Sequence, residues 1–223
     1  MIDTLKLWDT NLFLSLNSLH APFLDGFMSA ISEKLTWIPL YISVVYIVVL
    51  HWKRQAVWVV LALILCVVIS DQVSSNFIKD FVQRPRPSRE ENLKEYIHLV
   101  HNYTGGRYGF VSSHAANAVG FALLSSLLFK RKSYTIPIFI WAALTAYSRI
   151  YLGVHYPMDI LGGAVVGVLS AMLCFYVLKK YSPIQSHVYG NNSIAEKPKT
   201  RIIELVLYLS FAAIIIYSIF IFQ

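Results

Sequence analysis

Long apolar runs separated by shorter polar segments dominate this chain. Six runs approach the length of about 20 mainly apolar residues that a helix needs to cross a bilayer. They cover residues 37–52, 56–77, 113–129, 134–150, 158–178 and 202–222. The pattern predicts an all-α fold, a polytopic membrane helical bundle with about six transmembrane helices.

The start of the chain has a different pattern. In residues 4–19 polar positions interrupt the apolar ones every few residues, which favours a helix lying in the membrane interface over one crossing it. We expect Pro22 to end this helix and residues 22–33 to form a second short segment. The helix could be a plain anchor or a gate that admits lipid. We therefore expect one domain over residues 1–223, with an amphipathic interfacial segment at 1–34, a catalytic bundle at 35–180 and a final transmembrane helix at 202–222.

Composition supports a membrane protein. The chain of 223 residues is 57% hydrophobic and 14% charged, with a mean hydropathy of +0.56, whereas a soluble domain carries about 25% charged residues. The net charge of +7 suits lipid headgroups better than nucleic acid, because the basic residues do not gather with aromatic ones on a soluble face. Cys66 and Cys174 lie inside apolar runs, which indicates buried packing rather than a disulfide or a metal site.

The first residues of the chain contain the acidic Asp3 and Asp9, which argue against a cleavable signal peptide.

The polar connections divide into two sides. One side is basic and short, and by the positive-inside rule we expect it to be cytoplasmic. It carries Lys53, Arg54, Lys130, Arg131, Lys132, Lys179, Lys180, Lys197, Lys199 and Arg201. The other side carries the long connection 79–111 and the segment 148–159. We expect this second side of a bacterial cytoplasmic (inner) membrane protein to face the periplasm or the extracellular space.

The segment 148–159 places an arginine, a histidine and a carboxylate just outside a very apolar run. Pro157 suits the first turn of a new helix, where its missing N–H costs nothing. His155 would lie at that helix start, and Asp159, four residues on, could hold one ring nitrogen and aim the other outward. Arg149 offers a planar fork for phosphate oxygens. A basic or nucleophilic histidine beside an anion site suggests phosphoryl chemistry.

Phosphate-binding groups recur on the same side. Lys79, Arg86 and Arg149 can neutralise the charge on phosphoryl oxygens. Ser112, Ser113 and His114 lie at the start of the run 113–129, so the backbone N–H groups of a helix start there could bind phosphate. The set predicts a phosphate site formed by three separate segments.

The remaining roles in phosphoester cleavage fall on histidines. Neutral His155, oriented by Asp159, could attack phosphorus and form a phosphohistidine. His114 could protonate the leaving oxygen and then activate water. Each role is filled without a metal or cofactor. Taken singly, these residues could be headgroup anchors or helix caps. Asp71, inside the run 56–77, could be functional or merely interfacial.

Three motifs at these positions resemble the type-2 phosphatidic acid phosphatase superfamily. They read Lys79…Arg86-Pro87, Ser112-Ser113-His114, and Ser148-Arg149…His155…Asp159, and the resemblance covers about residues 71–180. It implies that Lys79, Arg86, Ser112, Ser113, His114 and Arg149 hold the phosphate. It also implies that His155 is the nucleophile, His114 the acid and Asp159 the partner of His155.

One residue departs from the family pattern, and several functions stay open. The second motif of the family usually reads Pro-Ser-Gly-His, and Ser113 replaces its glycine, which adds a side chain next to the phosphate. The bacterial membrane members that the chain resembles act on undecaprenyl pyrophosphate, phosphatidylglycerol phosphate or the phosphates of lipid A. We expect a metal-independent lipid phosphatase whose partners are its phosphorylated lipid and the bilayer. The alternatives are a lipid-to-lipid phosphotransferase and a non-enzymatic phospholipid-binding or transport protein.

Overall fold

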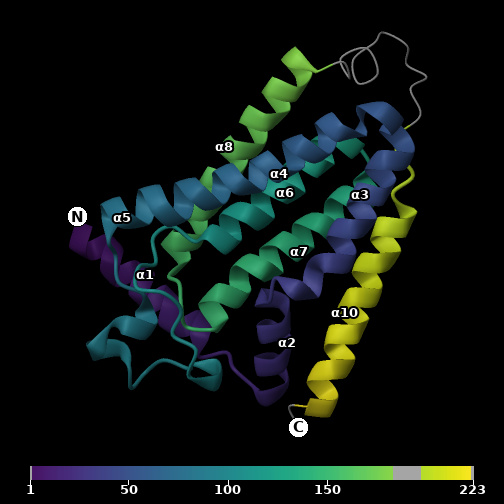
Figure 1. Ribbon diagram of the computed structural model, residues 1–223. Helices are drawn as coiled ribbons and strands as arrows, with labels where there is room; N and C mark the ends of the chain where they lie inside the picture. The colour runs from purple at the N-terminus through teal and green to yellow at the C-terminus, as the bar shows by residue number, and fades with distance from the viewer. Residues whose placement is uncertain (1, 183–196, 222–223) are drawn as a thin grey trace.

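The computed structural model describes residues 2–182 and 197–221, and these residues form helices without a β-strand (Figure 1). The α-helices are α1 (Ile2–Asn17), α2 (Pro22–Ser32), α3 (Ile38–Trp52), α4 (Ala56–Gln72), α5 (Lys79–Val82), α6 (Ser113–Phe129), α7 (Lys132–Tyr151), α8 (Pro157–Tyr181) and α10 (Arg201–Ile221). The predicted all-α bundle is confirmed. Phe222, the predicted end of the last span, and most of the connection 179–201 lie outside the described residues.

The predicted spans fall on α3, α4, α6, α7, α8 and α10. In the described residues, three stretches are long and apolar enough to cross a membrane, and Ser113–Phe129 is a shorter apolar helix. The three are Leu35–Val82, Pro157–Tyr181 and Arg201–Phe220. The first contains both α3 and α4, which are joined by the tight turn Lys53–Gln55.

Apolar side chains face outward along α8. Leu161, Val165, Leu169 and Leu173, spaced four residues apart, are each more than half exposed. Residues at this spacing share one face of a helix. A continuous exposed apolar stripe of this kind is costly in water and favourable against lipid. The bundle is therefore a membrane protein whose outer surface suits the hydrocarbon core.

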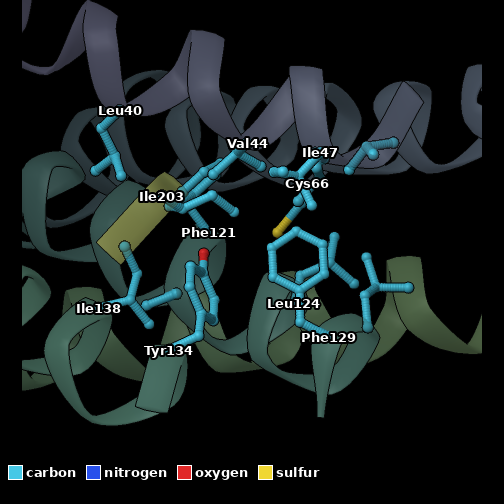
Figure 2. Close-up of a cluster of buried hydrophobic side chains, with 14 of the residues drawn as sticks. Leu40, Val44, Ile47, Cys66, Phe121, Leu124, Phe129, Tyr134, Ile138 and Ile203 are labelled. Carbon is cyan, nitrogen blue, oxygen red and sulfur yellow. The ribbon is translucent and has the colours of Figure 1, made fainter. Parts of the chain in front are cut away.

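The core lies between α2, α3, α4, α6, α7, α8 and α10. Figure 2 shows Val44, Cys66, Phe121 and Tyr134 meeting in this cluster, and all four are buried. The Tyr134 hydroxyl donates to Ser125 Oγ at 2.8 Å, so its polar atom is satisfied inside the core. This packing holds the helices that carry the candidate chemistry in a fixed arrangement.

Glycines let α8 lie against α6. A Cβ atom added to Gly163 would approach the carbonyl oxygen of Ser112 to 2.3 Å, and one added to Gly167 would approach that of Ala116 to 2.4 Å. Only a residue without a side chain permits such close helix contact. The contact places the start of α6, with the serine–histidine motif, directly against the start of α8.

Two sequence predictions about helix ends were wrong. α1 ends at Asn17 and not at Pro22. The predicted second segment, 22–33, is present as α2, and Pro22 begins it because proline fits the first helical position, where no N–H is needed. The helix predicted to end at 77 continues through a π-helical segment, Val73–Ile78, into α5. Lys79 therefore lies on a helix, and the long connection begins at Gln83. π-helical segments change which side of a helix the following residues occupy and occur often at functional sites.

The polar connections gather at two opposite ends, as the sequence predicts. In Figure 1 the connection after α5 lies beside α1 at the lower left, near the starts of α6 and α8. The basic turn between α3 and α4 and the start of α10 lie at the upper right. All the candidate catalytic and phosphate-binding residues thus belong to one end of the bundle.

Candidate active site

Lys79 enters the site from α5. Its Nζ lies 3.4 Å from the hydroxyl oxygen of Ser113 at the start of α6. The first two motifs of the sequence are thereby in direct contact. The ammonium group has donors left over for an anion, because an ammonium carries three N–H bonds.

Arg86 is buried in the connection after α5, with 7% of its surface exposed. Its Nε donates to the carbonyl oxygen of Tyr108 at 3.0 Å, and its Nη1 donates to that of Val154 at 3.4 Å. Burial and the neighbouring charge of Arg149 lower the pKa of Arg86 to about 10, which leaves the guanidinium charged at neutral pH. The bond to Val154 places this cation beside His155.

Arg149, near the end of α7, is almost fully buried at 3% exposure. Its Nη1 donates to the hydroxyl of Ser32, and its Nη2 donates to the Tyr103 hydroxyl at 3.2 Å. Burial alone would raise the pKa of Tyr103, but the charge and hydrogen bond of Arg149 outweigh it and lower that pKa. Within the described part of the chain, Arg149 Nε is buried without a hydrogen-bond partner. An unpaired buried donor is costly, and a phosphate oxygen would satisfy it.

The start of α6 is built as the sequence predicts. Ser112 is the N-cap, and its Oγ accepts the N–H of Ala115 at 3.4 Å. The N–H of Ser112 donates to the backbone carbonyl of Asp159 at 2.9 Å. This bond joins the second motif to the third. Ser113 and His114 occupy the first turn of α6, the positive end of the helix dipole.

His155 and Asp159 are paired and buried, at 1% and 0% exposure. The separation between His155 Nδ1 and Asp159 Oδ2 is 3.3 Å, and the same oxygen accepts the N–H of Tyr156 at 3.0 Å. α8 begins at Pro157, so the predicted helix start is confirmed. Asp159 therefore lies in the first turn of α8 and His155 just before that helix, with the carboxylate on Nδ1 of the ring.

The surroundings of His155 keep its ring neutral. Burial, reinforced by the cations Arg86, Arg149 and Lys79, holds the pKa of His155 well below its ordinary value of 6.5. A hydrogen bond with the backbone of Gly109 opposes this shift without cancelling it. A neutral imidazole keeps a lone pair on one of its nitrogens, which a nucleophile requires.

His114 lies where two cavities meet. A cavity of about 900 Å³ is lined by polar groups, including Arg149, Tyr103 and His101. A second cavity, of about 510 Å³, is lined mainly by apolar residues of α3 and α4. Ser32, Lys34 and His114 line both. An amphipathic molecule could therefore occupy both spaces with its polar–apolar junction at His114.

Asp71 belongs to the apolar cavity. Its Oδ1 accepts a hydrogen bond from Asn117 Nδ2 at 3.1 Å. Both residues line the cavity together with His114, one helical turn from Asn117. Asp71 is thus part of the surroundings of the site rather than a separate interfacial residue.

All eight predicted site residues meet at one end of the bundle, together with four neighbours that were not predicted from the sequence. Ser32 and Tyr103 hold Arg149, while Asp9 and Arg84 reach Asp159 through an ion-pair chain. Arg84 could have been noticed, since Arg84-Pro85 repeats the Arg86-Pro87 pair two residues earlier. The sequence carries no comparable signal for Ser32, Tyr103 or Asp9.

The donor set suits an anion rather than a metal ion. In residues 2–182 and 197–221, no group of three or more His, Cys, Asp and Glu side chains is placed to hold a metal ion. The groups that surround His155 are instead three cations, which match the charge of a phosphate.

Comparison with known proteins agrees with this picture. Residues 40–183 match the model of the PAP2 superfamily. The lipid A 4'-phosphatase of Bacteroides thetaiotaomicron is 38% identical over 98% of this chain and 99% of its own length. That of Porphyromonas gingivalis is 43% identical over 82% of this chain and 76% of its own. The crystal structure of a Bacillus subtilis transmembrane PAP2-type phosphatidylglycerolphosphate phosphatase has the same fold, with a TM-score of 0.62 at 20% identity over 81% of this chain and 89% of that one.

The helical membrane bundle and the three cations around its buried histidine–aspartate pair indicate a class of protein, a membrane enzyme that acts on phosphate esters. The chain belongs to the PAP2 superfamily. It is a membrane lipid phosphatase, a hydrolase.

Proposed function

We propose that the protein hydrolyses the 4'-phosphate monoester of lipid A through a phosphohistidine on His155. The observation that supports the reaction is the neutral, buried imidazole held through Nδ1 by Asp159 and surrounded by three cations. The two relatives named lipid A 4'-phosphatase support the choice of lipid.

The phosphate would bind between the three motifs. Lys79, Arg86 and Arg149 neutralise its oxygens, and the unpaired Nε of Arg149 gains an acceptor. The side chains of Ser112 and Ser113, with the N–H groups of the first turn of α6, complete the cradle. In the transition state the negative charge is spread over the three equatorial phosphoryl oxygens, where these cations and N–H groups would lie.

His155 Nε2 then attacks phosphorus in line with the leaving oxygen. The new N–P bond forms as the P–O bond to the sugar breaks, and Asp159 stabilises the positive charge that develops on the ring. His114 gives its proton to the leaving sugar oxygen. In the second half, His114 takes a proton from water, the water oxygen bonds to phosphorus, and the N–P bond breaks to release inorganic phosphate.

The two cavities fit a lipid with a large polar head. The polar cavity would take the sugar portion, and the apolar one would take hydrocarbon. We also propose that this end of the bundle faces the periplasm, because the basic connections lie at the opposite end.

The test is phosphate release by the purified protein in detergent. The substrates are lipid A carrying both phosphates, only the 4'-phosphate or only the 1-phosphate, together with undecaprenyl pyrophosphate and phosphatidylglycerol phosphate. We expect release from the first two and none after His155→Ala. His51→Ala, which alters a histidine next to the basic turn, should retain full activity. Release from undecaprenyl pyrophosphate or phosphatidylglycerol phosphate alone would refute the choice of lipid, and activity of His155→Ala would refute the mechanism.

A further inference from the structure

An ion-pair chain links the N-terminal helix α1 to the catalytic carboxylate. We propose that Asp9 and Arg84 are positioning residues that hold Asp159 in its place on His155. α1 would then be part of the catalytic apparatus rather than an anchor alone. The inference rests on the proposed function, since it assigns the two residues a role in the same reaction.

Arg84 bridges two buried carboxylates. Its Nη1 lies 2.8 Å from Asp9 Oδ2 and 3.1 Å from Asp159 Oδ1. Its guanidinium also covers the ring of Tyr156, 3.8 Å from the ring centroid. The two oxygens of Asp159 thus contact different partners. Oδ1 faces Arg84, while Oδ2 faces His155.

Asp9 fixes the other side of this bridge. Its side chain is 2% exposed, and its Oδ1 accepts the N–H of Met158 at 2.9 Å in the first turn of α8. The carboxylate of Asp9 therefore contacts both Arg84 and the helix that carries Asp159. Burying a carboxylate costs free energy unless it is paired in this way.

The orientation of α1 sets Asp9 apart from its neighbours. Leu5, Trp8 and Leu12 are each more than half exposed, so they face the surroundings of the bundle. Phe13 and Asn17, one and two turns after Asp9, are buried and already attach α1. Phe13 packs edge-on against Tyr156, and Asn17 donates to the carbonyl of Tyr151 at 2.8 Å. Anchoring alone therefore does not require a charge at position 9.

Loss of either partner should disturb the histidine. Without the charge of Asp9, Asp159 is the one carboxylate among the described residues that still pairs with Arg84. If that pair became bidentate, Asp159 would rotate and withdraw Oδ2 from His155 Nδ1. Without Arg84, the Oδ1 side of Asp159 loses its partner and the carboxylate is free to turn. In both cases the imidazole loses its fixed orientation, while the phosphate-binding cations stay in place.

The experiment measures kcat and KM for phosphate release from 4'-phosphorylated lipid A, and the thermal unfolding midpoint, in one detergent. The variants are Asp9→Asn, Arg84→Gln, Arg84→Lys and the double variant Asp9→Asn/Arg84→Gln. Asp3→Asn is the control, because it removes an exposed carboxylate from the same helix. We expect Asp9→Asn and Arg84→Gln to lower kcat about 10- to 100-fold with little change in KM, as for a small misplacement of a catalytic group.

Two further results are expected. The double variant should be no slower than Arg84→Gln alone, because the two residues act as one unit. Arg84→Lys should recover part of kcat, since it keeps the charge, and Asp3→Asn should match the wild type. A merely structural role would lower the unfolding midpoint and leave kcat per folded enzyme unchanged.

The positioning role would be overturned if Asp9→Asn left kcat unchanged, or if its effect were confined to KM or to stability. In that case the activity of the wild type would still support the proposed function. A wild-type protein without activity on any of the lipids would refute the proposed function and this inference with it.

Discussion

Replacing Asp159 with asparagine should cost far more activity than the loss of one hydrogen bond. The carboxylate has two oxygens and three donors around it. Oδ2 accepts from Tyr156 N–H at 3.0 Å and lies 3.3 Å from His155 Nδ1, while Oδ1 lies 3.1 Å from Arg84. Because Asp159 is fully buried, water cannot replace a missing acceptor.

An amide has only one oxygen to offer. Since Arg84 is a cation, we expect the oxygen of the substituted amide to face it and the NH₂ group to face His155. Nδ1 must then accept a hydrogen bond, so the ring proton moves to Nε2, the nitrogen that attacks phosphorus. The nucleophilic lone pair is lost in this tautomer.

The expected magnitude follows from this change of tautomer. The corresponding aspartate-to-asparagine change in a serine-protease triad lowers kcat by about 10⁴-fold. A loss of about 10³- to 10⁴-fold corresponds to about 4–5.5 kcal/mol, at about 1.36 kcal/mol for each factor of ten.

The assay is kcat for phosphate release by the folded variant in detergent, with Asp159→Asn compared with Asp159→Asn/Arg84→Met. Removing the cation frees the amide oxygen to turn to His155, so the double variant should be faster than Asp159→Asn alone. A loss of less than about tenfold in the single variant would refute the tautomer argument. A double variant slower than the single one would refute the role given to Arg84 in it.

Three other outcomes follow from the site. His114→Ala should slow release from lipid A far more than from an aryl phosphate, because an activated leaving group needs no proton; equal losses on both substrates would contradict its role as the acid. As the pKa of His155 is depressed in the folded state, the unfolded chain takes up this proton first as pH falls, so the free energy of unfolding should drop below about pH 6.5. His155→Gln should remove part of that drop in a thermal unfolding series from about pH 7.5 to about pH 5, and identical slopes would contradict the depressed pKa. Gly163→Ala should destabilise the protein by about 1–3 kcal/mol and reduce activity, because the added Cβ would approach the Ser112 carbonyl oxygen to 2.3 Å. The control Leu161→Ala, on the exposed face of α8, should change neither stability nor activity.

Much of the fold could be predicted because its signals are local. A proline at the first position of α8 and a serine cap before α6 depend on a few neighbouring residues, and both helix starts lie where the sequence indicates. Apolar runs identify the helices of the bundle since each run can satisfy its backbone only as a helix in lipid. Lys79 was predicted to lie in the polar connection rather than on a helix, because no local sequence signal marks the π-helical segment that extends the helix to Val82.

The candidate site divides in the same way. The sequence by itself predicted that Asp159 could reach His155, four residues before it; the two side chains do meet at the start of α8, although His155 lies just before the first helical residue, Pro157. It also predicted that three candidate anion-binding segments lie on one side, and these segments do lie at one end of the bundle (Figure 1). The roles of these residues in catalysis stay predictions until the variants are measured.

Tertiary structure alone decided what surrounds that pair. Ser32 reaches Arg149 across 117 positions of chain, and Arg84 reaches Asp159 across 75. Asp9 meets the N–H of Met158 across 149 positions. Such contacts follow from how helices pack, and residue spacing within one helix carries no information about them. The same packing creates the two cavities at His114, since their walls come from helices that are far apart in the sequence.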